Sequence, residues 1–86
     1  MRESINMSLP SKPEYVSIAR VTASFVANQM GFDVETIEDI KLAVGEACNN
    51  AIIHSGSDET YTLEFIKKND HLTIEVADSG KGFSLD

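Results

Sequence analysis

The stretch Lys41–Ser55 predicts a helix that carries both an apolar stripe and a line of polar side chains. Glu46, Asn50 and His54 recur at every fourth residue, which places them one above another on one side of a helix. The apolar stripe on a neighbouring face consists of Ile40, Val44, Ala47, Cys48 and Ala51. Such a polar line on its own is typical of a solvated surface, so its meaning depends on the rest of the chain.

The residues that precede this stretch predict a strand followed by a helix. Apolar and polar side chains alternate over Ile5–Leu9, which is typical of a short strand with one buried face, and Pro10 ends it. Ser11 and Glu14 match a capping box, which predicts the start of a first helix, and Gly31 predicts its end. The stripe expected to be buried on this helix consists of Tyr15, Ile18, Thr22, Phe25, Val26 and Met30.

A second helix and a hairpin complete the predicted fold. Asp33 is a typical N-cap, and the helix that it begins is expected to run to about His54. Alternation over Tyr61–Phe65 and over Leu72–Val76 predicts two strands, and the turn-forming residues at 68–71 join them into a hairpin. The element order is therefore β-α-α-β-β. Two helices on one face of a partly antiparallel sheet make an α+β fold, a two-layer α/β sandwich.

Composition narrows the class of protein. The 86 residues are expected to form a single domain, 1–86, and the formal net charge of −7 argues against a nucleic-acid-binding surface, because no basic cluster exists beyond Lys67–Lys68. Cys48 is the only cysteine, so it cannot form an internal disulfide. No apolar run reaches the roughly 18 residues that a membrane helix needs. We therefore expect a cytoplasmic protein with no membrane association.

The second strand of the hairpin continues to Asp78 and a glycine-rich turn that contains Gly80 and Gly82. A carboxylate at the end of a strand can accept a hydrogen bond from the exocyclic amine of adenine, and glycines allow a ligand to approach the backbone closely. Asn50 offers an oxygen ligand to Mg²⁺, and Glu46 could orient or deprotonate a nucleophile that attacks a γ-phosphate. Each signal is weak alone, and together they predict a nucleotide site.

One alternative stays open for the metal ligand. Asn49 adjoins Asn50, and only the four-residue spacing from Glu46 favours Asn50 as the metal ligand. Other chemistries fit less well, because the sequence has no Walker-type phosphate loop, no zinc-ligand spacing and no Ser-His-Asp elbow.

At these residues the sequence resembles the GHKL (Bergerat-fold) ATPase superfamily. Glu46-x-x-x-Asn50 resembles its N box, and Asp78-x-Gly80-x-Gly82 resembles its first glycine box. A closer resemblance, to the bacterial anti-sigma factor serine kinases, rests on four segments, which are residues 19–22, 25–27, 44–47 and 50–54. The resemblance covers nearly the whole chain, from the first strand to Gly82.

The resemblance implies a role for each motif residue. Asn50 would bind Mg²⁺ and Glu46 would be the catalytic base, while Asp78 would bind the adenine amino group of ATP. Gly80 and Gly82 would shape the pocket beside it. Family domains continue past the first glycine box into an ATP lid and a second glycine box, so for a chain that stops at residue 86 we expect an incomplete fold without these parts.

The resemblance also implies partners. Arg20 falls on the helix that, in anti-sigma kinases, faces the sigma factor or the anti-anti-sigma protein. These kinases phosphorylate a serine of that small antagonist and sequester the sigma factor as homodimers, thereby regulating transcription. Two alternatives stay open: a non-catalytic interaction module of the same fold, and the ATPase core of a sensor histidine kinase.

Overall fold

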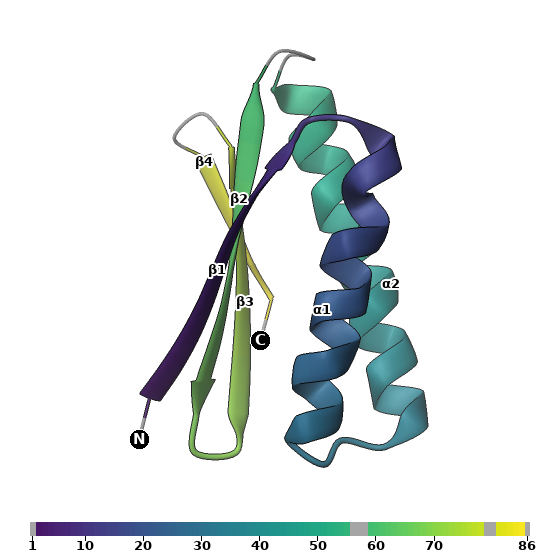
Figure 1. The fold of residues 1–86 in the computed structure, drawn as a ribbon, viewed down its shortest axis with the longest axis vertical. Coiled ribbons are helices and arrows are strands. Elements are labelled where there is room, and N and C mark those ends of the chain that lie inside the picture. The colour runs from purple at the N-terminus through teal and green to yellow at the C-terminus, as the bar shows by residue number, and fades with distance from the viewer. Residues whose placement is uncertain (1, 56–58, 79–80, 86) are drawn as a thin grey trace.

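The computed structural model describes residues 2–55, 59–78 and 81–85, the last range by its backbone alone. Its elements in chain order are β1 (Arg2–Pro10), the short 3₁₀ helix η1 (Pro13–Tyr15), α1 (Val16–Gln29), α2 (Val34–His54), β2 (Thr60–Lys68), β3 (His71–Asp78) and β4 (Lys81–Leu85). Both helices cover one face of the sheet, and they run in opposite directions (Figure 1). The predicted two-layer sandwich is therefore confirmed.

The sheet is antiparallel throughout, with the strand order β1-β2-β3-β4. Its inner face supplies the largest part of the core, namely Leu9, Tyr61, Leu63, Phe65, Leu72, Ile74 and Val76. The predicted hairpin is confirmed, because Asn69 adopts a positive φ of 57° in the turn between β2 and β3. β4 was not predicted. Gly82 was expected in a turn, but it lies within this strand.

The first strand is longer and less buried than predicted. β1 pairs with β2 from Arg2 to Pro10, because backbone hydrogen bonding extends beyond the apolar alternation. Leu9 is buried, but Ile5 is 38% exposed. Figure 1 gives the reason, since the N-terminal end of β1 leans away from the helical layer. Only the end of β1 nearest α1 is covered.

The stripe predicted to be buried on α1 is mostly wrong. Ile18 and Phe25 are 44% and 59% exposed, and of the predicted stripe only Val26 is fully buried. The buried face of α1 consists of Val16, Ala19, Ala23, Val26 and Ala27. Three of these residues are alanines, and α1 packs mainly against α2. Small side chains allow the two helices to approach closely, and the larger apolar side chains of α1 are left on the solvent side.

The ends of the helices test the predicted caps. Asp33 is confirmed as the N-cap of α2, because its carboxylate accepts a 2.8 Å hydrogen bond from the Thr36 backbone N–H. The hydrogen bonds from Thr36 hold the pKa of Asp33 below its ordinary value. Gly31 has a φ of 83°, a left-handed conformation that suits glycine and that follows the end of α1 as predicted.

The capping box predicted at the start of the first helix is wrong. Lys12 is the N-cap of η1 and makes no side-chain capping bond. The hydroxyl of Ser11 is instead buried, and it lies 2.6 Å from the hydroxyl of Ser55, the residue that follows α2. The Ser11 backbone N–H also donates to the Glu59 carbonyl, just before β2. Tertiary hydrogen bonds thus replace the local cap at this position.

The hydroxyl of Tyr61 is buried in the core and has no hydrogen-bond partner among the described residues. Its polar neighbour is the thiol of Cys48 on α2, and burial, followed by this thiol, raises the pKa of Tyr61. Burial also raises the pKa of the Cys48 thiol. This pair marks the place where α2 meets β2.

Replacing Tyr61 with phenylalanine is expected to stabilise the fold. Removing an unpaired buried hydroxyl should raise the free energy of unfolding by about 1 kcal/mol, because such a hydroxyl loses its hydrogen bonds to water on folding and gains none in return. Thermal unfolding followed by circular dichroism measures the change, with Tyr15→Phe as a matched control at a half-buried position. A lower unfolding temperature for Tyr61→Phe would mean that the hydroxyl makes a stabilising bond.

Candidate functional site

The polar line on α2 lies on the solvent-exposed side of the helix. Glu46, Asn50 and His54 are all exposed. The buried residues of α2 lie on its other side and are Val44, Gly45, Ala47, Cys48 and Ala51. The predicted separation of a polar face from an apolar stripe is therefore confirmed. Asn49 is exposed as well, about 100° around the helix from Asn50.

Asp78 lies at the end of β3 and is only 7% exposed. Within the described part of the chain, no side chain or backbone N–H donates a hydrogen bond to its carboxylate. A carboxylate at this position can accept a hydrogen bond from a donor group of a ligand. An exocyclic amine is a donor of this kind.

The sheet register brings Asp78 to the level of the polar line on α2. Thr62 pairs with Ala77, so the next positions along the two strands are Tyr61 and Asp78. The Tyr61 side chain reaches across the core to Cys48, which lies between Glu46 and Asn50 in the sequence of α2. The later half of α2 and the end of β3 are therefore at the same end of the two layers, which is also visible in Figure 1.

The two predicted glycines have different outcomes. Gly80 lies outside the described residues. Gly82 lies in β4, where its backbone is opposite Ala77, and the neighbouring Lys81 is opposite Asp78. The β4 backbone therefore runs directly beside the end of β3, although a role for Gly82 in ligand binding stays a prediction.

A cleft of about 780 Å³ opens between α2 and β3. Its walls are formed by Phe32, Thr36, Asp39, Ile40, Ala43, Asp70, His71, Leu72, Thr73 and Ile74. Asp39 and Ala43 are seven residues before Glu46 and Asn50, so all four lie on the same side of α2. The cleft thus runs along the side of α2 that carries the polar line, and it lies closer to the β2–β3 hairpin than Asp78 does.

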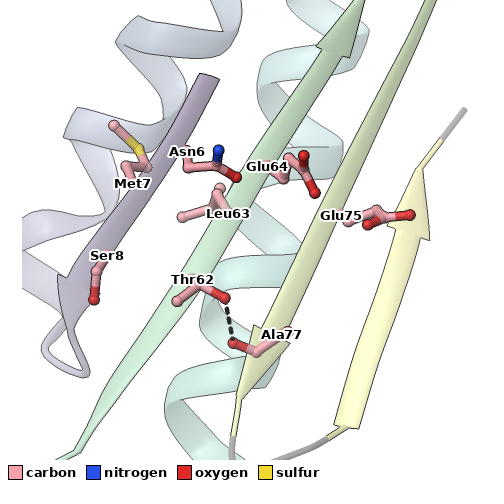
Figure 2. Close-up of a pocket in the computed structure, with 8 residues that line it drawn as sticks. All are labelled: Asn6, Met7, Ser8, Thr62, Leu63, Glu64, Glu75 and Ala77. Atoms are coloured by element: carbon pink, nitrogen blue, oxygen red, sulfur yellow. Dashed lines mark hydrogen bonds between the residues drawn. The ribbon is translucent and has the colours of Figure 1, made fainter. Parts of the chain in front are cut away.

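The outer face of the sheet has a second, shallower hollow of about 480 Å³ (Figure 2). Small polar side chains surround it, together with Glu64 and Glu75, which are direct partners on neighbouring strands. Ser4 donates a 2.9 Å hydrogen bond to Glu64. Two adjacent carboxylates repel phosphates, so this hollow is poorly suited to a nucleotide.

Arg20 is exposed on α1, away from the polar line. Its side chain crosses α2 at Gly45, where an added Cβ would be 3.2 Å from the Arg20 Cδ. Gly45 is about 140° around α2 from Asn50. The salt bridges of the described residues do not involve Arg20, so its charge is available to a partner.

The described residues contain no group of three or more His, Cys, Asp or Glu side chains that could hold a metal ion by themselves. Magnesium bound with a nucleotide needs few protein ligands, since phosphates and waters complete its coordination. An exposed amide such as that of Asn50 is compatible with this role.

None of the described helices is long and apolar enough to cross a membrane.

Comparison with known proteins identifies the family. The family model described as the histidine kinase-like ATPase domain matches residues 9–86. The chain belongs to this family. The resemblance to GHKL ATPases is thereby confirmed, and relatives named serine-protein kinase RsbW match the predicted anti-sigma kinase branch.

Three of these relatives illustrate the similarity. The protein of Oceanobacillus iheyensis is 47% identical over 85 residues, which cover 95% of this chain and 54% of the relative. That of Bacillus pumilus is 48% identical over 86 residues, or 94% of this chain and 53% of the relative. A Listeria monocytogenes relative is 42% identical over 89 residues, with coverages of 100% and 57%. The chain spans about half the length of these relatives.

Proposed function

We propose that the chain binds Mg-ATP between the polar side of α2 and the end of β3, as the nucleotide-binding part of an anti-sigma serine-protein kinase. The observation that carries this proposal is the buried Asp78 carboxylate, which has no donor among the described residues and lies at the level of Glu46 and Asn50. The relatives are named serine-protein kinases, which supports this reaction class and favours it over that of a sensor histidine kinase.

Asp78 and Asn50 hold the nucleotide in this proposal. The Asp78 carboxylate accepts a hydrogen bond from the adenine amino group, which relieves the cost of its burial. Gly80 and Gly82 are assigned to the pocket beside the base, since glycine lets a ligand approach the backbone closely. Asn50 would supply one oxygen ligand to Mg²⁺, which when bound would neutralise charge on the phosphates.

Glu46 acts as the catalytic base. Its carboxylate, one helical turn from Asn50, accepts the proton of a serine hydroxyl on the substrate protein. The serine oxygen then forms a bond to the γ-phosphorus, while the bond from that phosphorus to the leaving oxygen of ADP breaks. Glu46 is exposed, so a protein substrate can reach it.

The proposed partners are a sigma factor and a small anti-anti-sigma protein, and the proposed site of action is the cytoplasm. Arg20 is the residue assigned to partner binding, because it is exposed and its charge is not used in a described salt bridge. A desolvated Arg–carboxylate pair is directional and strong. We propose the homodimer as the assembly that sequesters the sigma factor.

Thermal unfolding with and without Mg-ATP tests the nucleotide site. A ligand that binds only the folded state adds about 2.7 kcal/mol at one hundred times its dissociation constant, so the unsubstituted chain should unfold at a clearly higher temperature with Mg-ATP. Asn50→Ala should remove most of this shift. Asn49→Ala is the matched control, since it makes the same change one residue away, and it should keep the shift. A shift that is lost in Asn49→Ala and kept in Asn50→Ala would reassign the metal ligand.

A non-catalytic interaction module is the second candidate, and the exposed Arg20 is the observation that favours it. Arg20→Glu is expected to weaken binding of the anti-anti-sigma protein at least tenfold, because the reversed charge repels a partner carboxylate. Arg2→Glu, the same change at the exposed start of β1, is the control. Partner binding that needs Arg20 but is unaffected by ATP would select the interaction module, and full binding by Arg20→Glu would rule out this surface.

A further inference from the structure

Gly45 lies in the middle of α2, where the backbone conformation does not explain a glycine. Glycine disfavours a helix relative to alanine, and its particular use is at positions that need a positive φ. Among the described glycines only Gly31 has a positive φ, so Gly45 has the ordinary backbone of a helix. Alanine would favour the helix more at this position, and the reason for a glycine therefore lies in the space around it.

The space beside Gly45 is filled by the side chain of Arg20 from α1. An added Cβ would lie 3.2 Å from the Arg20 Cδ, 3.5 Å from its Nη1 and 4.0 Å from its Cγ, and no other atom from outside α2 is as near. Carbon atoms in contact are normally about 3.5–4.0 Å apart, so a side chain at position 45 would push Arg20 away. The bare backbone at Gly45 thus lets the Arg20 side chain lie directly against α2.

The packing against Gly45 orients the Arg20 side chain. Arg20 takes part in none of the salt bridges or side-chain hydrogen bonds of the described residues, so no polar contact among them fixes its guanidinium. An arginine loses rotamer freedom when it is fixed, and a group that is ordered beforehand binds a partner at a lower entropy cost. The planar guanidinium also recognises a carboxylate in a fixed geometry, so a change in its direction weakens the pair.

We infer that Gly45 is a positioning residue for partner binding, because the lack of a side chain at this position lets Arg20 lie across α2 and directs its guanidinium toward a carboxylate of the partner protein. Gly45 does not touch the partner in this inference and acts through Arg20. The inference rests on the proposed function, which assigns Arg20 to partner binding.

The mobility of the Arg20 side chain tests the positioning without any partner. The chain has two arginines, Arg2 and Arg20, and Arg2 is the built-in reference because it is exposed at the start of β1. Nuclear magnetic relaxation of the two Nε–H groups should show Arg20 as the more restricted one. Gly45→Ala should raise the mobility of Arg20 toward that of Arg2. Equal mobility of Arg20 in the two chains would overturn the inference.

A double-mutant cycle with the anti-anti-sigma protein tests the effect on binding. Arg20→Ala should weaken binding by about tenfold or more, because the guanidinium is removed. Gly45→Ala should weaken it by about three- to fivefold, because the guanidinium is displaced but still present. In the Arg20→Ala background, which is the matched control, Gly45→Ala should cause no further loss. Titration calorimetry measures the four affinities.

The possible outcomes separate this inference from the function on which it rests. Full binding by Gly45→Ala with a loss in Arg20→Ala, or an equal loss from Gly45→Ala in both backgrounds, would overturn the inference while leaving Arg20 in the proposed function. Full binding by Arg20→Ala would overturn the assignment of Arg20 and the inference together. Gly45→Ala should unfold at the same temperature as the unsubstituted chain or a higher one, since alanine favours the helix. A lower temperature would mean that the methyl group separates α1 from α2 instead of moving Arg20, which would also overturn the inference.

Discussion

Asp78→Asn is expected to lower the affinity for Mg-ATP by about 100-fold while leaving the unliganded fold at least as stable. The carboxylate is buried, so a neutral amide should be easier to accommodate when no nucleotide is bound. The same change replaces a charged acceptor for the adenine amine with a neutral group, and a hydrogen bond to a charged group is worth about 1.5–3 kcal/mol. Titration calorimetry and thermal unfolding measure the two effects separately.

A fall in nucleotide affinity without a loss of stability would distinguish a ligand-binding role of Asp78 from a structural one. A purely structural carboxylate would lose stability on substitution, and affinity would fall only as a consequence. Asp70→Asn, at the exposed hairpin turn, is the control for a generic charge change. Unaltered nucleotide affinity in Asp78→Asn would remove the adenine contact from the proposal.

Glu46→Gln is expected to reduce phosphoryl transfer to a substrate serine by roughly 10²- to 10⁴-fold, the usual contribution of a positioned general base. Glutamine has nearly the same shape but cannot accept the proton. Affinity for Mg-ATP should be unchanged, because Glu46 is assigned to the serine hydroxyl and not to the nucleotide. Transfer of labelled γ-phosphate to the anti-anti-sigma protein measures the rate, and calorimetry measures the affinity.

Glu35→Gln is the control for Glu46→Gln, since Glu35 is an exposed acid in the first turn of the same helix. It should transfer phosphate at the rate of the unsubstituted chain. A rate that survives in Glu46→Gln would assign the proton to another group. A rate below detection in every variant, with nucleotide binding intact, would instead favour the non-catalytic interaction module.

The polar line could be found from the sequence because helix periodicity is a local property. Glu46, Asn50 and His54 are four residues apart, and the side chains of any helix at that spacing share a side. The position of Asp78 at the level of this line could not be predicted in the same way. It depends on the register of β2 with β3 and on the contact between Tyr61 and Cys48, which lie 13 residues apart in the sequence and in different layers.

The same contrast explains the predictions that were wrong. Ser11 and Glu14 match a local capping pattern, but the Ser11 hydroxyl lies against that of Ser55, 44 residues away. On α1 the large apolar side chains suggested one buried face, whereas the face that is buried is the one with three alanines, which suits close packing against α2. Neither outcome can be read from neighbouring residues.

By itself, then, the sequence determined the order of the five predicted elements, the N-cap at Asp33, the hairpin turn and the polar side of α2. These features follow from periodicity and turn chemistry, which act over a few residues. The tertiary structure alone decided which face of α1 is buried, that β4 extends the sheet, and that the carboxylate of Asp78 is buried at the level of the α2 polar line. The physical reason is that burial and strand register are set by contacts between segments far apart in the chain, which no local pattern encodes.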